Sequence, residues 1–111
     1  MLIGPEAGAR GSLRVYGRAK WAQTDRIGGP LDHIFDSLRA SFSELRIERL
    51  TVTNESNEEL LWFISLPGKP VVLQIECRPA GESPFLVESD DESKETNEVG
   101  VAVETLTAWL R

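Results

Sequence analysis

The side chains best suited to acid–base or metal chemistry stand together at Asp32, His33 and Asp36. Residues four apart share one face of a helix, so the two aspartates would lie together, with the imidazole of His33 about 100° away. A zinc site normally uses three or four converging His or Cys ligands, and the chain has one His and one Cys. We therefore predict no metal site. We interpret the cluster as a solvated helix face with Asp36 near Arg39.

Cys77 is the only thiol, and its use as a nucleophile would require a base such as His33. It stands in phase with Val71, Leu73 and Ile75, which is the pattern of a buried structural cysteine. The sequence has no phosphate-binding loop, no dinucleotide-binding glycine motif, no nucleophile elbow and no Cys-x-x-Cys pair. We therefore predict that the protein is not an enzyme, has no catalytic residues and uses no cofactor.

The elements that would position these side chains follow from hydrophobic periodicity. Alternation or short apolar runs predict strands at 13–21, 46–53, 60–64, 71–78 and from Phe85 to Val87. Apolar residues at helical spacing predict helices at 30–44 and at about 95–110, the second capped by Thr96 or Asn97. Short turns between successive strands favour an antiparallel meander. The predicted fold is α+β, an antiparallel four- to five-stranded sheet with two amphipathic helices packed on it, in the order β-α-β-β-β-β-α.

A chain of 111 residues is one domain by length and can bury a core without disulfides or metal. We assign 13–111 to a single α+β domain and expect 1–12, rich in Gly and Ala, to be irregular or mobile. The run 60–64 is apolar on both faces of a strand, and such strands are usually covered on both sides. Shared phase predicts that eight side chains are buried together: Phe35, Leu38, Trp62, Ile64, Leu73, Ile75, Val103 and Leu106.

Charge is unevenly distributed along the chain. The net charge is −6, but residues 1–26 carry +3 and the remainder carries −9. Such a body repels phosphate backbones, so we expect no nucleic-acid partner, although the strand at 13–21 mixes Tyr16 with Arg14, Arg18 and Lys20. A positively charged protein is the natural partner of this acidic body. With a single cysteine and no apolar run that fits a signal peptide or membrane span, we expect a cytoplasmic protein without a membrane partner.

The acidic stretch from Glu88 to Glu98 is the candidate partner-binding surface. It sets six acidic residues against Lys94 alone: Glu88, Asp90, Asp91, Glu92, Glu95 and Glu98. The simpler interpretation is a solvated loop that leads into a helix; the functional one is a docking surface for a basic partner. Tight binding would also need a desolvated anchor, and Phe85 and Trp109 are the nearest aromatic residues in the sequence.

In its size, its acidity, its predicted α+β fold and its lack of a catalytic motif, the chain resembles the small acidic immunity proteins of bacterial toxin systems. Examples are the systems of contact-dependent growth inhibition and related polymorphic toxins. The stretch from Pro84 to Asp91, then Glu95-Thr-Asn and a final amphipathic helix to Trp109-Leu110, is similar to small bacterial proteins of this kind. The resemblance implies a protein that neutralises a cognate toxin, often a basic nuclease, by covering its active site. The alternative class is an acidic secretion chaperone, usually a homodimer, that holds an extended segment of an effector. Both a monomer and a homodimer are therefore compatible with the sequence.

Overall fold

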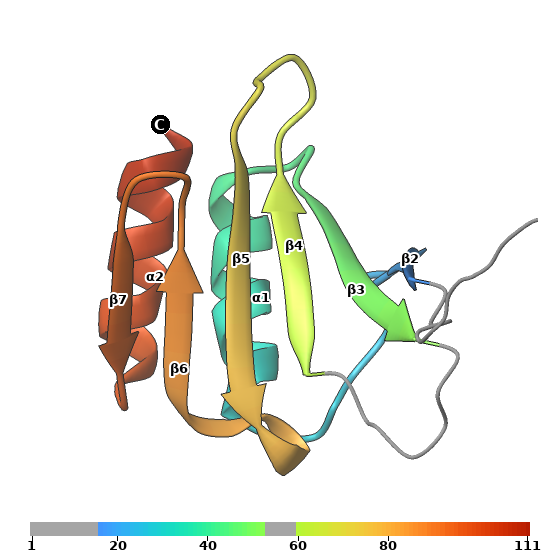
Figure 1. Cartoon of the computed structure of the whole chain (residues 1–111), viewed down its shortest axis with the longest axis vertical. Helices are drawn as coiled ribbons and strands as arrows, with labels where there is room; N and C mark the ends of the chain where they lie inside the picture. The colour runs from blue at the N-terminus through green and yellow to red at the C-terminus, as the bar shows by residue number, and fades with distance from the viewer. Residues whose placement is uncertain (1–15, 53–59) are drawn as a thin grey trace, which may run out of the picture.

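A computed structural model describes residues 16–52 and 60–111 of the chain. The segment 1–12, the first residues of the strand predicted at 13–21 and residues 53–59 lie outside the described residues. Over the described residues the chain forms one antiparallel sheet of six strands in sequential order (Figure 1). The strands are β2 (Tyr16–Lys20), β3 (Arg46–Val52), β4 (Leu61–Ser65), β5 (Val72–Arg78), β6 (Glu82–Glu88) and β7 (Ser93–Thr96). The α+β fold and the antiparallel meander are confirmed, with one strand more than the upper number predicted.

Two helices in the described part of the chain, α1 (Pro30–Ser41) and α2 (Val99–Leu110), lie on the same face of this sheet. In Figure 1, α1 lies behind β4 and β5, and α2 lies behind β6 and β7. Pro30 stands in the first turn of α1, where its missing N–H is not needed. The helix ends earlier than the predicted range 30–44 because Phe42 is already extended, with φ −130° and ψ 96°.

The additional strand β7 replaces the start of the predicted helix at 95–110. Its residues Ser93–Thr96 are polar and show no apolar alternation, so periodicity could not indicate a strand. Backbone pairing with β6 determines it, after a turn in which the Ser89 N–H donates to the Glu92 carbonyl at 2.8 Å. The helix α2 then begins at Val99, and neither Thr96 nor Asn97 is its N-cap. Thr96 instead accepts a hydrogen bond from the Glu98 N–H at 3.1 Å.

The core lies between the helices and the sheet face that they cover. Seven of the eight side chains predicted to be buried together are buried there, with Trp62, Ile64, Leu73 and Ile75 fully excluded from solvent. Val103 is only half-buried, because α2 directs Ala102, Leu106 and Leu110 towards the sheet instead. The ring of Trp62 is held edge-on by Phe35 at 5.9 Å and Trp21 at 5.6 Å between centroids.

The opposite face of the sheet, toward the viewer in Figure 1, is not covered by any described element. We call it the open face. Alternation along the strands places Phe63 of β4 on it, between the buried Trp62 and Ile64. The run 60–64 was expected to be covered on both sides, and that expectation was wrong in one respect. Phe63 is only 9% exposed because the guanidinium of Arg18 stacks 3.8 Å from its ring centroid, without a second layer of described structure.

Candidate functional site

Two rows of cross-strand neighbours run across the open face. Register links one residue from every strand into the first row: Lys20, Glu48, Phe63, Gln74, Glu88 and Ser93. The second row pairs Arg18 with Leu50 on β2 and β3 and continues through Leu61, Glu76, Leu86 and Glu95 on β4 to β7. Side chains directly opposite each other on one face lie about 4.5–5.5 Å apart at Cβ. Each row is therefore a stripe of neighbouring side chains across the sheet.

The charges on the open face are separated into two halves. The basic half, on β2 and β3, carries Arg18, Lys20 and Arg46 against Glu48. The acidic half, on β5 to β7, carries Glu76, Glu88 and Glu95. Arg78 and Glu82 oppose each other at its far end, so this pair leaves the balance unchanged. A strand order that follows the sequence thus converts the uneven charge of the chain into a charge gradient across one surface.

Apolar side chains lie between these charged residues on the open face. The half-buried members of this set lie on β3 to β6: Leu50, Leu61, Val72 and Leu86. Leu86 stands between Glu76 and Glu95 in the second row. Together with Pro84, Cys77 and Arg78 these three residues line a hollow of about 260 Å³. An apolar floor between two carboxylates suits an aliphatic side chain that ends in a cation.

The structure divides the six predicted partner-binding residues into three groups. Glu88 and Glu95 stand on the open face, beside Glu76, which the prediction did not include. Asp90, Asp91 and Glu92 are exposed in the turn between β6 and β7, which we call the acidic turn. Glu98 is the exposed N-cap of α2, at the other end of β7. Alternation in 71–78 already separated Glu76 from the core residues, but only strand pairing brings it to Glu95.

The carboxylates between Glu88 and Glu98 form no ion pair with any described residue. The two ion pairs in the described ranges join Arg18 to Glu48 at 3.8 Å and Arg26 to Asp36 at 2.8 Å. Both are exposed, so each contributes little to folding. The acidic half and the acidic turn therefore hold negative charge that the described chain does not neutralise.

Neither aromatic residue proposed as an anchor is available beside these carboxylates. Phe85 is fully buried, and Trp109 is half-buried and packed against the core. The reason is the phase of β6, which directs Phe85 and Val87 to the helices and Leu86 to the open face. Leu86 is the apolar side chain that the fold places in the anchor position.

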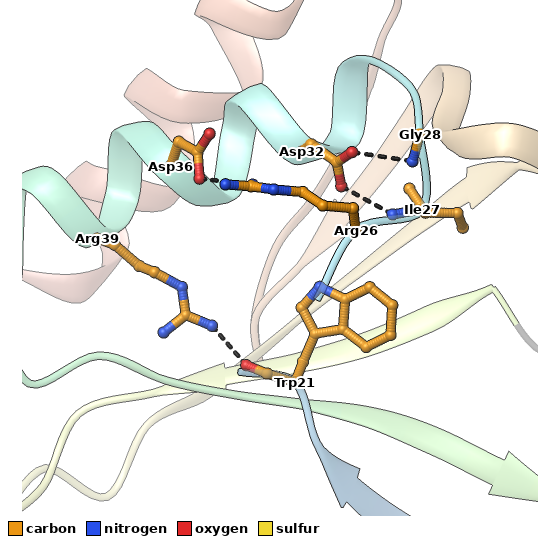
Figure 2. Close-up of polar contacts among 7 residues, drawn as sticks. All are labelled: Trp21, Arg26, Ile27, Gly28, Asp32, Asp36 and Arg39. Atoms are coloured by element: carbon orange, nitrogen blue, oxygen red, sulfur yellow. Dashed lines mark hydrogen bonds and ion pairs between the residues drawn. The ribbon is translucent and has the colours of Figure 1, made fainter. Parts of the chain in front are cut away.

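A second hollow, of about 360 Å³, lies at the end of β2 and β3. Three cations contribute to its lining, Lys20, Arg39 and Arg46, with Glu48 as the single carboxylate. Arg39 reaches it from the last turn of α1 and donates a hydrogen bond to the Trp21 carbonyl (Figure 2). This cationic hollow stands at the end of the sheet that also carries the acidic turn, because Lys20 and Ser93 belong to the same row.

The aspartate pair on α1 holds the loop that precedes the helix (Figure 2). Asp32 accepts hydrogen bonds from the backbone N–H groups of Ile27 at 3.0 Å and Gly28 at 2.9 Å. Asp36 forms its ion pair with Arg26, a partner that periodicity did not indicate. It also lies near Arg39, as expected: burial lowers the pKa of that guanidinium, and the charge of Asp36 opposes this effect. Within the described ranges no three His, Cys, Asp or Glu side chains are arranged to hold a metal ion.

Cys77 is half-buried at the border of the core, and not fully buried as its phase predicted. The register of β5 and β6 shifts between Glu76 and Arg78, so alternation no longer fixes the direction of the thiol. Burial raises its pKa from 9.0 to about 11, although nearby Arg49 acts in the opposite sense. The thiol lines the hollow beside Leu86, whereas exposed His33 lines a different one. This arrangement disfavours a thiolate nucleophile activated by His33.

Comparison with family models, curated proteins and solved structures finds no match to this chain. None of the described helices is long and apolar enough to cross a membrane. The function is therefore argued from the charges and contacts of the open face.

Proposed function

We propose that the protein binds a cationic protein through the acidic half of its open face and the acidic turn, and that it is an immunity protein that neutralises a basic nuclease toxin. The observation that carries the proposal is the set of carboxylates around half-buried Leu86 without an ion pair among the described residues. Charge and a desolvated apolar contact are the two components that a tight interface combines.

The physical basis is complementarity to a nucleic-acid-cleaving partner. A nuclease must present a positive cleft to phosphates. Carboxylates on a rigid sheet can occupy such a cleft in place of phosphates, without the cost of ordering a flexible loop. Their field also accelerates the encounter by roughly 10- to 1,000-fold, and this acceleration falls as salt rises. The contact with Leu86 then lowers the rate of dissociation.

The test is association kinetics between this protein and the product of the neighbouring toxin gene, measured over a salt series. The variant Glu88→Lys/Glu95→Lys should associate at least about 10-fold more slowly at low salt and lose most of the salt dependence. The matched control Glu44→Lys/Glu104→Lys makes the same charge change at exposed sites away from the open face. It should stay within about 2-fold of the parent. Equal rates for the two variants would overturn the proposal.

The apolar row favours a second candidate, the acidic secretion chaperone. Leu50, Leu61 and Leu86 are half-buried on a face that a bound extended segment could cover. The two candidates differ in the state of the partner that they recognise. An immunity protein binds the folded toxin, so a denatured fragment of the partner should bind at least about 100-fold more weakly. A fragment that binds as tightly as the folded partner would favour the chaperone.

A further inference from the structure

We propose that the open face is self-complementary, and that two copies of this chain bind each other through it as a homodimer with a two-fold axis parallel to the strands. The proposal stands independently of the proposed function. It uses the whole open face, including the basic half, for which the cationic partner gives no role.

The symmetry follows from the order of charge across the sheet. Most oligomers are closed by a two-fold axis, which brings the same patch of both copies together. For two sheets face to face, an axis parallel to the strands reverses the strand order, so β2 and β3 of one copy lie on β6 and β7 of the other. An axis across the strands would place β2 on β2 and bring cations onto cations. Charge therefore selects the first arrangement, in which each basic half meets an acidic half.

The outer positions of the second row are complementary under this operation. Its order from β2 to β7 begins with Arg18 and Leu50 and ends with Leu86 and Glu95. Reversal places Arg18 opposite Glu95 of the second copy and Leu50 opposite Leu86 of the second copy. The central pairing is less favourable, because it places Leu61 opposite Glu76 of the second copy. An apolar pair beside a pair of opposite charges is the usual composition of a protein interface, and the central carboxylate lowers the affinity.

The first row contains one unfavourable pairing, and the structure supplies its compensation. Reversal brings Glu48 opposite Glu88 of the second copy. Glu48 already pairs with Arg18 at 3.8 Å and lies next to Lys20 in register, with Arg46 two residues away on the same strand. The local field on β2 and β3 is therefore positive despite Glu48, and it attracts Glu88 of the second copy.

The acidic turn faces two further cations at the same end of the sheet. The turn follows β6, and Lys20 and Arg46 stand at the end of β2 and the start of β3. An axis parallel to the strands keeps this end in place while it exchanges the two sides. The acidic turn of each copy then lies beside Lys20 and Arg46 of the other, so opposite charges meet at this end as well. The cationic hollow takes no part, because Arg39 and the buried Leu45 and Ile47 place it on the helix side of the sheet.

The size of the face determines how strong the dimer should be. Strands spaced about 4.8 Å apart and about five residues long, at about 3.4 Å per residue, give a face of roughly 25 by 17 Å. This projected area of roughly 400 Å² is smaller than the roughly 800 Å² that each partner contributes to a standard interface. We therefore expect a dimer that forms in the micromolar range and dissociates on dilution or in high salt.

The experiment is sedimentation velocity of the full chain from about 1 to 200 µM, at low and high salt. The parent should pass from 12.3 kDa to twice that mass as its concentration rises, and high salt should shift the transition by at least 10-fold in concentration. Lys20→Glu/Arg46→Glu should remain monomeric, and so should Glu88→Lys/Glu95→Lys. These side chains make no ion pair within the described residues, and unchanged thermal melting of each variant will show that the fold is intact.

The decisive variant exchanges the charges of the directly opposed pair, Arg18→Glu/Glu95→Lys, and keeps the net charge at −6. Glu95→Lys alone should weaken the dimer, because it places a second cation opposite Arg18. The double variant should dimerise more strongly than Glu95→Lys, since opposite charges face each other again. Thermal melting will show that it is folded, and the control Glu44→Lys/Glu104→Lys should dimerise like the parent. A parent that stays monomeric throughout, single-half variants that still dimerise, or a folded charge exchange that dimerises no more strongly than Glu95→Lys would each overturn the proposal.

The two proposals can fail separately. The cationic partner and the second copy would use the same acidic half, so they must compete for it. Lys20→Glu/Arg46→Glu keeps the acidic half and should bind the cationic partner at least as fast as the parent. A monomeric parent whose partner binding still depends on Glu88 and Glu95 would reject only the dimer. A dimer whose partner binding is unaffected by Glu88→Lys/Glu95→Lys would reject only the proposed function.

Discussion

The two faces of the sheet are formed by alternate residues of the same strands, and different interactions stabilise them. On the covered face Leu73 and Ile75 are fully buried among apolar residues beneath the helices, and the guanidinium of Arg49 approaches this face at the Trp62 ring. On the open face Phe63 is shielded by the stacked guanidinium of Arg18, and its neighbours are charged or half-buried. Burial therefore restricts which residue types the covered face accepts, because an unpaired charge would be costly there. The open face tolerates many substitutions in the monomer, which leaves it free to carry a binding function.

The largest difference between the two faces should appear on truncation of equivalent leucines. Leu73→Ala should lower the free energy of unfolding by about 2–5 kcal/mol, because it leaves a cavity under α1. Leu61→Ala, on the open face of the neighbouring strand, should cost about 1 kcal/mol, since water can fill the space that it leaves. Denaturant unfolding measures both values. Equal losses would contradict the assignment of Leu61 to a solvent-accessible face.

Cys77 lies at the border of the covered face, and the reactivity of its thiol measures how far solvent and reagents reach that border. A rise in pKa from 9.0 to about 11 lowers the thiolate fraction near neutral pH by about 100-fold. Labelling by a thiol reagent at pH 8 should therefore be about 100-fold slower in the folded than in the unfolded protein. The folded rate should keep rising towards pH 11. Rapid stoichiometric labelling at neutral pH would contradict the burial of this thiol.

The same thiol gives a pH dependence of stability whose sign follows from proton linkage. A raised pKa means that the folded state holds the proton more tightly than the unfolded state. This contribution to stability is fully present below pH 9 and is lost as the pH rises from 9.0 towards 11. Cys77→Ala should lack that loss, and thermal melting of both proteins between pH 8 and 11 will compare them. Parallel curves would show that the thiol has the same pKa in both states.

Arg18 tests whether its stacking substitutes for a second layer over Phe63. Arg18→Ala should cost about 1 kcal/mol, since it removes a cation–π contact worth about 0.5–1 kcal/mol and uncovers the ring. Arg18→Met should recover about half of that loss, because its chain can still cover the ring. Lys20→Ala, its neighbour on the same face, should stay within about 0.5 kcal/mol of the parent. A loss on Lys20→Ala that equals the loss on Arg18→Ala would assign the effect to charge alone.

The smallest effect is expected at Gly100, an exposed residue in the first turn of α2. A Cβ atom at Gly100 would meet nothing within 4 Å, so the close packing that a glycine permits is not used there. Gly100→Ala should raise the free energy of unfolding by about 0.4–1 kcal/mol. Gly29→Ala, before α1, should lower it, because its Cβ would lie 1.9 Å from the Ala80 carbonyl oxygen. Thermal melting of both variants will show whether the signs differ.

Hydrophobic periodicity by itself was sufficient to predict which residues form the covered face. The spacing of Leu38, Leu73 and Ile75 reports burial directly, because a side chain enters the core only when its element presents that phase. The fold class, both helices and most strands followed from this signal. The acidic stretch was also evident in the sequence, since charge density needs no knowledge of structure. Which of its residues share a surface was not evident, because cross-strand neighbours are far apart in the sequence.

Tertiary structure alone decided the composition of the open face. Strand pairing places Leu86 between Glu76 and Glu95, and the phase of β6 directs Phe85 into the core, contrary to its expected role as an anchor. The strand β7 itself exists through backbone hydrogen bonds to β6, to which its polar side chains contribute no periodic signal. The separation of charge into two halves likewise depends on strand order. Local sequence specifies the phase of each element, whereas the neighbours across a sheet follow from which strands pair and in what register.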